Sequence, residues 1–213
     1  MLECNPWLKI WVKPRETISE IVSFNPKYRL GILSALYGFP LLLHMAQMLS
    51  LGSTVSVAFI AIVSVILAFF VGMIVFAIGS YLLLWTGKWI GGRGDFASIR
   101  AAFAWSNVGN VFNSAIWIVL MSYFGSSLFD PAFASRTFIG NEMTLVLSVF
   151  SVQLVVSIWC FVLFLKTLGE VQGFSAWKAF LNLIIASLLV VAASILFVWG
   201  LSWVFTGMYV VGQ

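Results

Sequence analysis

"LGILSALYGFPLLLHMAQMLSLGSTVSVAFIAIVSVILAFFVGMIVFAIGSYLLLWTG", Leu30–Gly87, contains no Asp, Glu, Lys or Arg. A helix crosses the hydrocarbon core of a bilayer with about 20 apolar residues, each of which rises about 1.5 Å. The stretch is therefore long enough for two membrane-spanning helices. One run of small and polar turn-forming residues interrupts it, "SLGST" at Ser50–Thr54, and this run is the expected turn between the two helices.

The composition of the whole chain extends this interpretation. Of 213 residues, 62% are hydrophobic and 8% are charged, and the mean hydropathy is +1.08, whereas a soluble domain has roughly a quarter of its residues charged. Three more uncharged stretches are each long enough to cross a bilayer: 101–129, 144–165 and 179–213. The sequence predicts an all-α polytopic membrane helical bundle with five transmembrane helices, near residues 30–49, 55–85, 99–124, 142–165 and 177–205.

Small residues recur at near-helical spacing in the first two predicted spans. Because lipid removes the hydrophobic force between helices, membrane helices associate through close van der Waals contact between small residues. The two stripes are Gly31, Ala35 and Gly38 in the first span and Ser64, Ala68 and Gly72 in the second. We expect these stripes to pack on neighbouring helices.

The positions of the cations predict the orientation, because Lys and Arg in short loops are retained on the cytoplasmic side. Of the 11 Lys and Arg residues, only Arg136 lies in a connection on the opposite side from the other ten. With five spans, the N-terminus is expected in the cytoplasm and the C-terminus outside. The net charge of +4 follows from this asymmetry, so it indicates no nucleic-acid partner.

Residues 1–29 form an expected cytoplasmic segment with an amphipathic pattern. At about 100° per residue, one face collects Trp7, Ile10, Trp11, Pro14, Ile18, Ile21 and Val22. Such a helix lies in the membrane interface, and Trp7 and Trp11 would anchor it at the headgroup level. Pro14 removes a helical hydrogen bond, so we expect two short helices, the second beginning near Pro14. The alternative is that the same face packs on the cytoplasmic end of the bundle.

Three segments together resemble the Yip (Ypt-interacting or Rab-interacting) family of membrane proteins: "KPRETISEIVSFNP", "GGRGDFASIRAAFAWS" and "LKTLGEVQGFSAWKAFL". The resemblance implies a five-span Yip-type transmembrane domain over residues 30–213. Eukaryotic relatives are associated with small GTPases and vesicle traffic, but they have a longer cytoplasmic N-terminal region. The short segment here favours a compact bacterial type in the cytoplasmic (inner) membrane. The chain departs from the family at 107–110, where "NVGN" replaces a pattern that often contains proline.

The glycine-rich connection "GGRGDF" is the expected second cytoplasmic loop. It does not match a phosphate-binding P-loop, because Gly87-Lys88 is followed by Trp89 rather than Ser or Thr. Its glycines allow a tight reversal, and Asp95 is placed to cap the next helix. A structural turn is the simplest interpretation. The functional alternative is a docking surface for a protein or a lipid headgroup, formed by Gly91, Gly92, Arg93, Asp95, Lys166, Glu170 and Gln172.

Polar side chains share one face of the third predicted span: Arg100, Asn107, Asn110 and Ser114. In the predicted topology, His44, Asn110 and Gln153 lie at similar depths, which would permit one shared hydrogen-bond network, and the six side chains are the candidates for a polar cavity. Unpaired amides in hydrocarbon are costly and must find partners or water. Two interpretations remain open, interhelical hydrogen bonds and a polar cavity that accepts a headgroup or a small solute.

These observations disfavour enzymes. A reacting group needs an activating partner, yet the chain has one histidine and no carboxylate in the inner part of any span. We expect no catalytic, cofactor-binding or metal-binding residues. The preferred function is a non-enzymatic membrane protein that organises membrane or recruits lipid or protein partners through its cytoplasmic loops. The alternative is a transporter or channel for a small solute or lipid, built as a homo-oligomer, although the sequence shows no intramembrane Asp, Glu or Lys and no Pro-Gly broken helix.

Overall fold

The computed structural model describes residues 5–211, and their side chains except those at positions 134, 201 and 203–211. Every regular element in this range is a helix, and the order is α1 (Pro6–Lys9), α2 (Pro14–Phe24), α3 (Leu30–Met48), η1 (Leu51–Ser53), α4 (Val57–Trp89), α5 (Phe96–Ser106), α6 (Asn110–Phe124), η2 (Gly125–Phe129), η3 (Pro131–Ser135), α7 (Asn141–Gln172) and α8 (Ala176–Val211), where η marks a short 3₁₀-helix. Within the described residues, five helical stretches are long and apolar enough to cross a membrane, namely Leu30–Met48, Val57–Trp89, Asn110–Phe129, Asn141–Gln172 and Ala176–Gly200. The predicted all-α, five-span class is confirmed.

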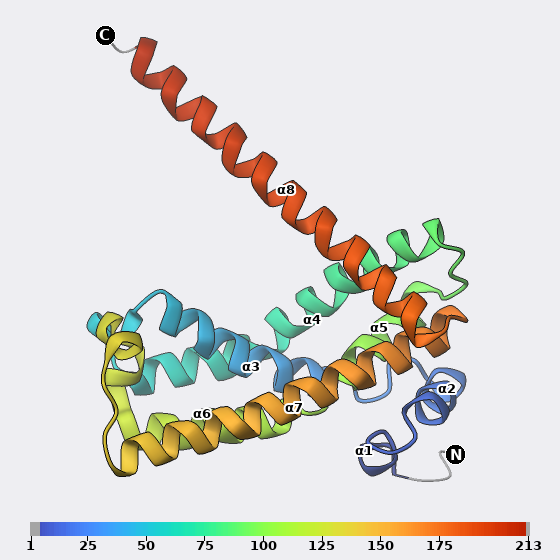
Figure 1. Ribbon diagram of the computed structural model, residues 1–213, viewed down its shortest axis with the longest axis horizontal. Coiled ribbons are helices and arrows are strands. Elements are labelled where there is room, and N and C mark those ends of the chain that lie inside the picture. Colours follow the sequence, from blue (N-terminus) through green and yellow to red (C-terminus); the bar gives the residue numbers. More distant parts are fainter. Residues whose placement is uncertain (1–4, 212–213) are drawn as a thin grey trace.

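The connections of the bundle are sorted between its two ends (Figure 1). One end gathers α1, α2, the turn between α4 and α5, and the turn between α7 and α8. The opposite end carries η1, η2 and η3. Arg136 lies just after η3, where its guanidinium pairs with Glu142 at 2.5 Å. The ten remaining cations are therefore separated in space from Arg136, as the charge pattern predicts.

The helices α3 and α4 form a close hairpin through their small residues. Gly38 and Gly72 are both buried, and a Cβ at either position would collide with a backbone carbonyl of the other helix, that of Ala68 or of Ser34. The predicted stripe on α4 is confirmed as a packing surface, since Ser64, Ala68 and Gly72 are all buried. On α3, Gly38 and its neighbour Ser34 are buried, whereas Gly31 and Ala35 lie at the edge of the contact.

The third predicted span is not continuous, which corrects the prediction of a single span over residues 99–124. It is divided into α5 and α6, and backbone bonds in the gap join residues three apart, including Asn107 N–H to the Ala104 carbonyl at 3.1 Å. The Asn107 side chain explains this change, because its Nδ2 donates to the Phe103 carbonyl at 2.9 Å. That carbonyl would otherwise accept the backbone N–H of Asn107 in an α-helix. The segment therefore tightens into a 3₁₀ turn.

Ser114 has a structural role that follows from a proline in α3. Pro40 is buried inside α3 and has no N–H to donate to the carbonyl four residues before it. That carbonyl belongs to Leu36, and the Ser114 hydroxyl from α6 donates to it at 3.4 Å. A side chain on a neighbouring helix thus supplies the donor that the proline removes, as is common in membrane helices.

The N-terminal segment packs on the bundle as two short helices. The second begins at Pro14, which confirms the prediction from that proline. Ile10, Ile18 and Ile21 are fully buried and share one apolar cluster with α5 and α7, the helices that contribute Ala101, Trp105 and Leu163. The segment and the transmembrane helices consequently share a core.

The last helix, α8, leaves the bundle after its first turns. Ala179, Asn182 and Ala186 are buried against its neighbours, but every residue from Val190 to Gly200 is exposed. Figure 1 shows α8 diverging at a wide angle from α7 and α4. This divergence opens a space between α8 and the helices that it would otherwise cover.

Candidate ligand cavity

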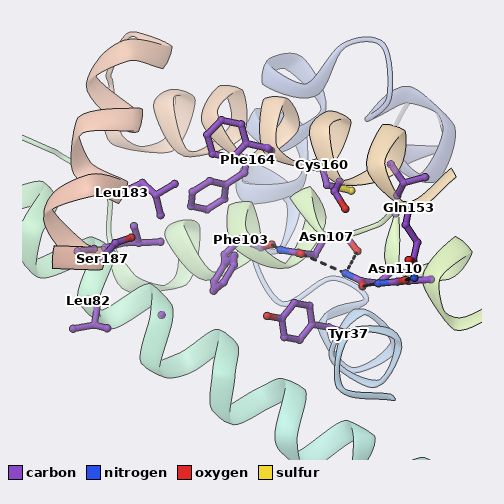
Figure 2. Close-up of a pocket in the computed structure, with 18 of the residues that line it drawn as sticks. Tyr37, Leu82, Phe103, Asn107, Asn110, Gln153, Cys160, Phe164, Leu183 and Ser187 are labelled. Carbon is purple, nitrogen blue, oxygen red and sulfur yellow. Dashed lines mark hydrogen bonds between the residues drawn. The ribbon is translucent and has the colours of Figure 1, made fainter. Parts of the chain in front are cut away.

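A cavity of about 640 Å³ lies beside α8, and side chains from α3 to α8 line it. Figure 2 shows Phe164 and Leu183 on one side of it and Leu82 and Tyr37 on the other, with Phe103 between them. Its polar lining consists of amides and hydroxyls: Asn107, Asn110, Asn113, Gln153, Ser157, Ser187 and the phenol of Tyr37. Sites that bind small molecules are typically pockets of roughly 300–1,000 Å³ with apolar walls and a few convergent polar groups.

The four amides form one string of hydrogen bonds along the broken span. Gln153 Nε2, on α7, donates to Asn113 Oδ1 at 3.0 Å. Asn113 Nδ2 donates to Asn110 Oδ1 at 3.3 Å. Asn110 Nδ2 then donates to the Asn107 carbonyl at 3.1 Å and approaches Asn107 Oδ1 at 3.4 Å. The string ends where Asn107 donates to the Phe103 carbonyl. Figure 2 shows the two contacts of the Asn110 amide with Asn107 as dashed lines.

The structure brings together three of the six side chains expected to share a polar cavity, Asn107, Asn110 and Gln153. The other three lie elsewhere. His44 is exposed and does not line the cavity, and Ser114 bonds to α3. Arg100 also stays outside the lining, with its guanidinium carbon 5.1 Å from the centre of the Phe96 ring and its buried Nε without a hydrogen-bond partner among the described residues.

Asn113 is the member of the string that sequence reasoning missed. On an uninterrupted helix at 100° per residue, Asn113 lies about 60° beyond Asn110 and outside the polar face. The 3₁₀ turn adds about 20° per residue, which rotates α6 and turns Asn113 toward the cavity. Tyr37 and Ser187 were missed for a different reason, because they reach the cavity only through the packing of α3 and α8.

The expected cytoplasmic docking residues include one that is internal. Gln172 is only 1% exposed, and its Nε2 donates to the Leu83 carbonyl at 3.1 Å. The glycines beside it make room, because a Cβ at Gly87 or Gly92 would collide with the Gln172 amide. The backbone carbonyl of Gln172 in turn accepts a hydrogen bond from the Arg93 backbone N–H at 3.1 Å. Gln172 therefore holds the glycine-rich loop on the end of α7 rather than facing a partner.

The remaining docking residues lie at the surface with different surroundings. Gly91, Arg93 and Lys166 are exposed. Glu170 pairs with Arg15 of α2 at 3.5 Å. Asp95 caps α5 as predicted by accepting the Ser98 N–H at 3.2 Å, and hydrogen bonding from Ser98 holds the pKa of this carboxyl below its ordinary value.

The two predicted anchor residues face the bundle. The Trp7 ring meets Trp105 edge-on, with centroids 5.3 Å apart, and Trp11 meets Phe112 at 5.9 Å. The large apolar side chains that this segment leaves exposed are Leu8, Val12 and Phe24, at 72%, 81% and 54%. Interfacial anchoring through the two tryptophans therefore stays a prediction.

Ion pairs hold the polar face of the same segment. Lys9 Nζ lies 2.7 Å from Glu16 and 2.5 Å from Glu20. The hydrogen bond to Glu16, followed by the one to Glu20, raises the pKa of Lys9 above its ordinary value. The hydrogen bond from Lys9 lowers the pKa of Glu16. These charges bind one another, so the segment presents fewer free cations than its sequence suggests.

The chemistry available in the cavity is binding by hydrogen bonds and apolar contact. Its lining carries no Asp, Glu, Lys, Arg or His. Among the described residues, no group of three or more His, Cys, Asp or Glu side chains comes close enough together to hold a metal ion.

A helical bundle that spans the membrane five times, with a broken third span and cationic connections gathered at one end, defines a multi-pass integral membrane protein. A model of the Yip1 domain matches residues 8–210, which is nearly the whole chain, so the protein belongs to the Yip1 domain family. No curated protein and no solved structure matches the chain.

Proposed function

We propose that this Yip1 family protein is non-enzymatic and organises the membrane by holding a lipid in the cavity beside α8. The observation that carries the proposal is the cavity itself, which combines an apolar wall with a string of amides at the centre of a membrane-spanning bundle. Lipid chains match the apolar wall, and a polar group of the lipid matches the amides. The divergence of α8 gives such a molecule a lateral way in from the bilayer.

A protein partner on the cytoplasmic face belongs to the same proposal. Arg93 and Lys166 are exposed at the end where the cationic segments gather. Arg15 and Glu170 connect α2 to α7 at this end, and the side chain of Gln172 connects α7 to α4. A partner that binds here would contact elements that also frame the cavity. Either another protein or a second copy of the chain fits this role.

Transport is the second candidate, and the broken third span favours it. Transporters place their substrate sites where a membrane helix is interrupted, because freed backbone groups and polar side chains then meet the substrate. The interruption at 107–109 lies beside the cavity, and Asn107 and Gly109 both line it. A transporter would move a small solute or a lipid along the string of amides.

Filling the cavity tests the proposal. Ser157 and Ser187 line it and are exposed within it, so the double variant Ser157→Phe/Ser187→Phe occupies the space without displacing buried packing. We expect the wild-type protein in native lipid discs to retain a stoichiometric lipid by native mass spectrometry, and the double variant to lose it. Ser151→Phe is the matched control, because Ser151 is exposed on α7 and does not line the cavity.

Equal retention by the wild type and the double variant would contradict the lipid-holding function. Solute uptake into liposomes containing the wild-type protein, abolished in the double variant, would favour the transporter instead.

The proposed location is the cytoplasmic membrane of a bacterium, with the N-terminus inside and the C-terminus outside. The gathering of ten cations at one end of the bundle supports this orientation. We expect a reporter that is active only outside the cytoplasm to be active when fused after Gln213. The control is the same reporter fused after Gly91, in the loop between α4 and α5, where it should be inactive. Activity of a cytoplasm-only reporter after Gln213 would reject the orientation.

A further inference from the structure

We infer that the cavity selects an uncharged lipid alcohol, a molecule with apolar chains and a free hydroxyl group, over an anionic lipid. The inference rests on the proposed lipid-holding function and specifies the chemistry of its ligand. It follows from the direction of the amide string, from lining hydroxyls without partners and from the absence of charge in the lining.

The string of amides has a direction. Each amide N–H₂ group donates toward α5, from Gln153 through Asn113 and Asn110 to Asn107, which donates to a backbone carbonyl. At the start of this string, Gln153 Oε1 accepts no hydrogen bond from the described residues. The free end of the string is therefore an acceptor, and it suits a ligand that donates a hydrogen bond.

The hydroxyl groups that line the cavity also have unused hydrogen-bonding capacity. Ser157 and Ser187 make no hydrogen bond within the described structure, although other serines on the same helices do. Ser151 on α7 donates to the Leu147 carbonyl at 2.8 Å, and Ser194 on α8 donates to the Val190 carbonyl at 2.8 Å. The Tyr37 phenol, which Figure 2 shows directed into the cavity, also has no hydrogen-bond partner among the described residues. These groups can donate to and accept from a second polar atom of the ligand, such as an ester oxygen.

The lining contains no formal charge. An anionic phosphate moved into a low-dielectric site without a counter-charge loses its hydration with no compensating ion pair. The cation closest to the string in sequence, Arg100, is not part of the lining, and its guanidinium lies over the Phe96 ring. A neutral hydroxyl loses far less on entering this site, and the Gln153 carbonyl replaces its bond to water.

Three lipids that differ in one group test the inference. The probes are dioleoylglycerol, its acetate, in which the free hydroxyl is blocked, and dioleoyl phosphatidic acid, in which the hydroxyl carries a charged phosphate. Each is added at equal amount to discs of a neutral lipid that contain the full-length protein, and retention is read by native mass spectrometry. We expect dioleoylglycerol to be retained about tenfold more than either analogue, as one good hydrogen bond predicts.

A protein variant gives a second measurement. Gln153→Leu removes the free acceptor and keeps a side chain of similar size. The variant should therefore retain dioleoylglycerol and its acetate about equally. Ser151→Ala is the matched control on the same helix, because it removes a hydroxyl bonded to its own helix, and it should keep the tenfold preference. The comparison among the three lipids on the wild-type protein does not depend on how the variant folds.

The outcomes separate the two proposals. Equal retention of dioleoylglycerol and its acetate, or a preference for phosphatidic acid, overturns the inference while leaving the lipid-holding function intact, provided that filling the cavity with the two phenylalanines abolishes retention. Retention that survives the filled cavity, or no retention of any of the three lipids, overturns the proposed function and the inference with it.

Discussion

Replacing Gly72 by leucine is expected to lower the melting temperature of the detergent-solubilised protein by roughly 6–12 °C. A Cβ at this position would collide with the Ser34 backbone carbonyl, and neither α3 nor α4 can move away without separating the hairpin. Overpacking a close contact costs about 3 kcal/mol, and each kcal/mol shifts the melting temperature by about 2–4 °C in a protein of this size. Tryptophan fluorescence or light scattering during heating measures the change.

Gly200→Leu is the matched control for this prediction. Gly200 also lies in a membrane-spanning helix, but a Cβ there would meet nothing within 4 Å. The same added side chain should therefore leave the melting temperature unchanged or raise it slightly, because leucine favours helix more than glycine does. If Gly72→Leu behaves like Gly200→Leu, α3 and α4 do not pack as described.

The number of spans could be predicted from sequence because the bilayer imposes a length on every crossing. The uncharged stretch Leu30–Gly87 is too long for one crossing and too apolar for water, so its division at the Ser50–Thr54 turn follows from composition alone. The stripe of small residues on α4 could also be predicted from the sequence, since small residues at helical spacing mark the surfaces where membrane helices pack. These features depend on local pattern, which the sequence displays.

The break in the third span was beyond the reach of the same reasoning. Asn107 is compatible with a continuous helix, and the segment divides because its amide competes for the Phe103 carbonyl. The sequence displayed the residue types without indicating which hydrogen bond would prevail. The predicted polar face was consequently placed on the wrong helical phase after Asn107, and Asn113 was left out of it.

The cavity depends on contacts between helices that are far apart in sequence. His44 and Gln153 were expected at similar depths, yet depth does not specify the direction of a side chain around its helix. His44 is exposed, whereas Gln153 reaches Asn113. The opening beside α8 has no sequence signal at all, because the apolar residues of α8 would read the same if the helix packed along its whole length.

The glycine-rich loop was interpreted as a turn or a docking surface. The structure adds a third explanation, that glycines at this end of α4 leave room for the buried amide of Gln172, and a substitution at Gly87 tests it. Alanine usually stabilises a helix relative to glycine by about 1 kcal/mol, yet Gly87→Ala should destabilise this protein by about 1–3 kcal/mol, because its Cβ would collide with the buried amide of Gln172. Gln172→Ala should also destabilise, since it removes the hydrogen bond to the Leu83 carbonyl, although Asn182 still donates to that carbonyl at 3.1 Å. The double variant Gly87→Ala/Gln172→Ala should lose less stability than the sum of the two single changes, because the second substitution removes the group with which the first collides.

Urea or thermal unfolding of the wild type, the two single variants and the double variant measures this coupling, and Gly200→Ala shows the ordinary effect of the same substitution on an open helix face. Additive losses, or a stabilising Gly87→Ala, would mean that Gln172 does not occupy the space which the glycine leaves.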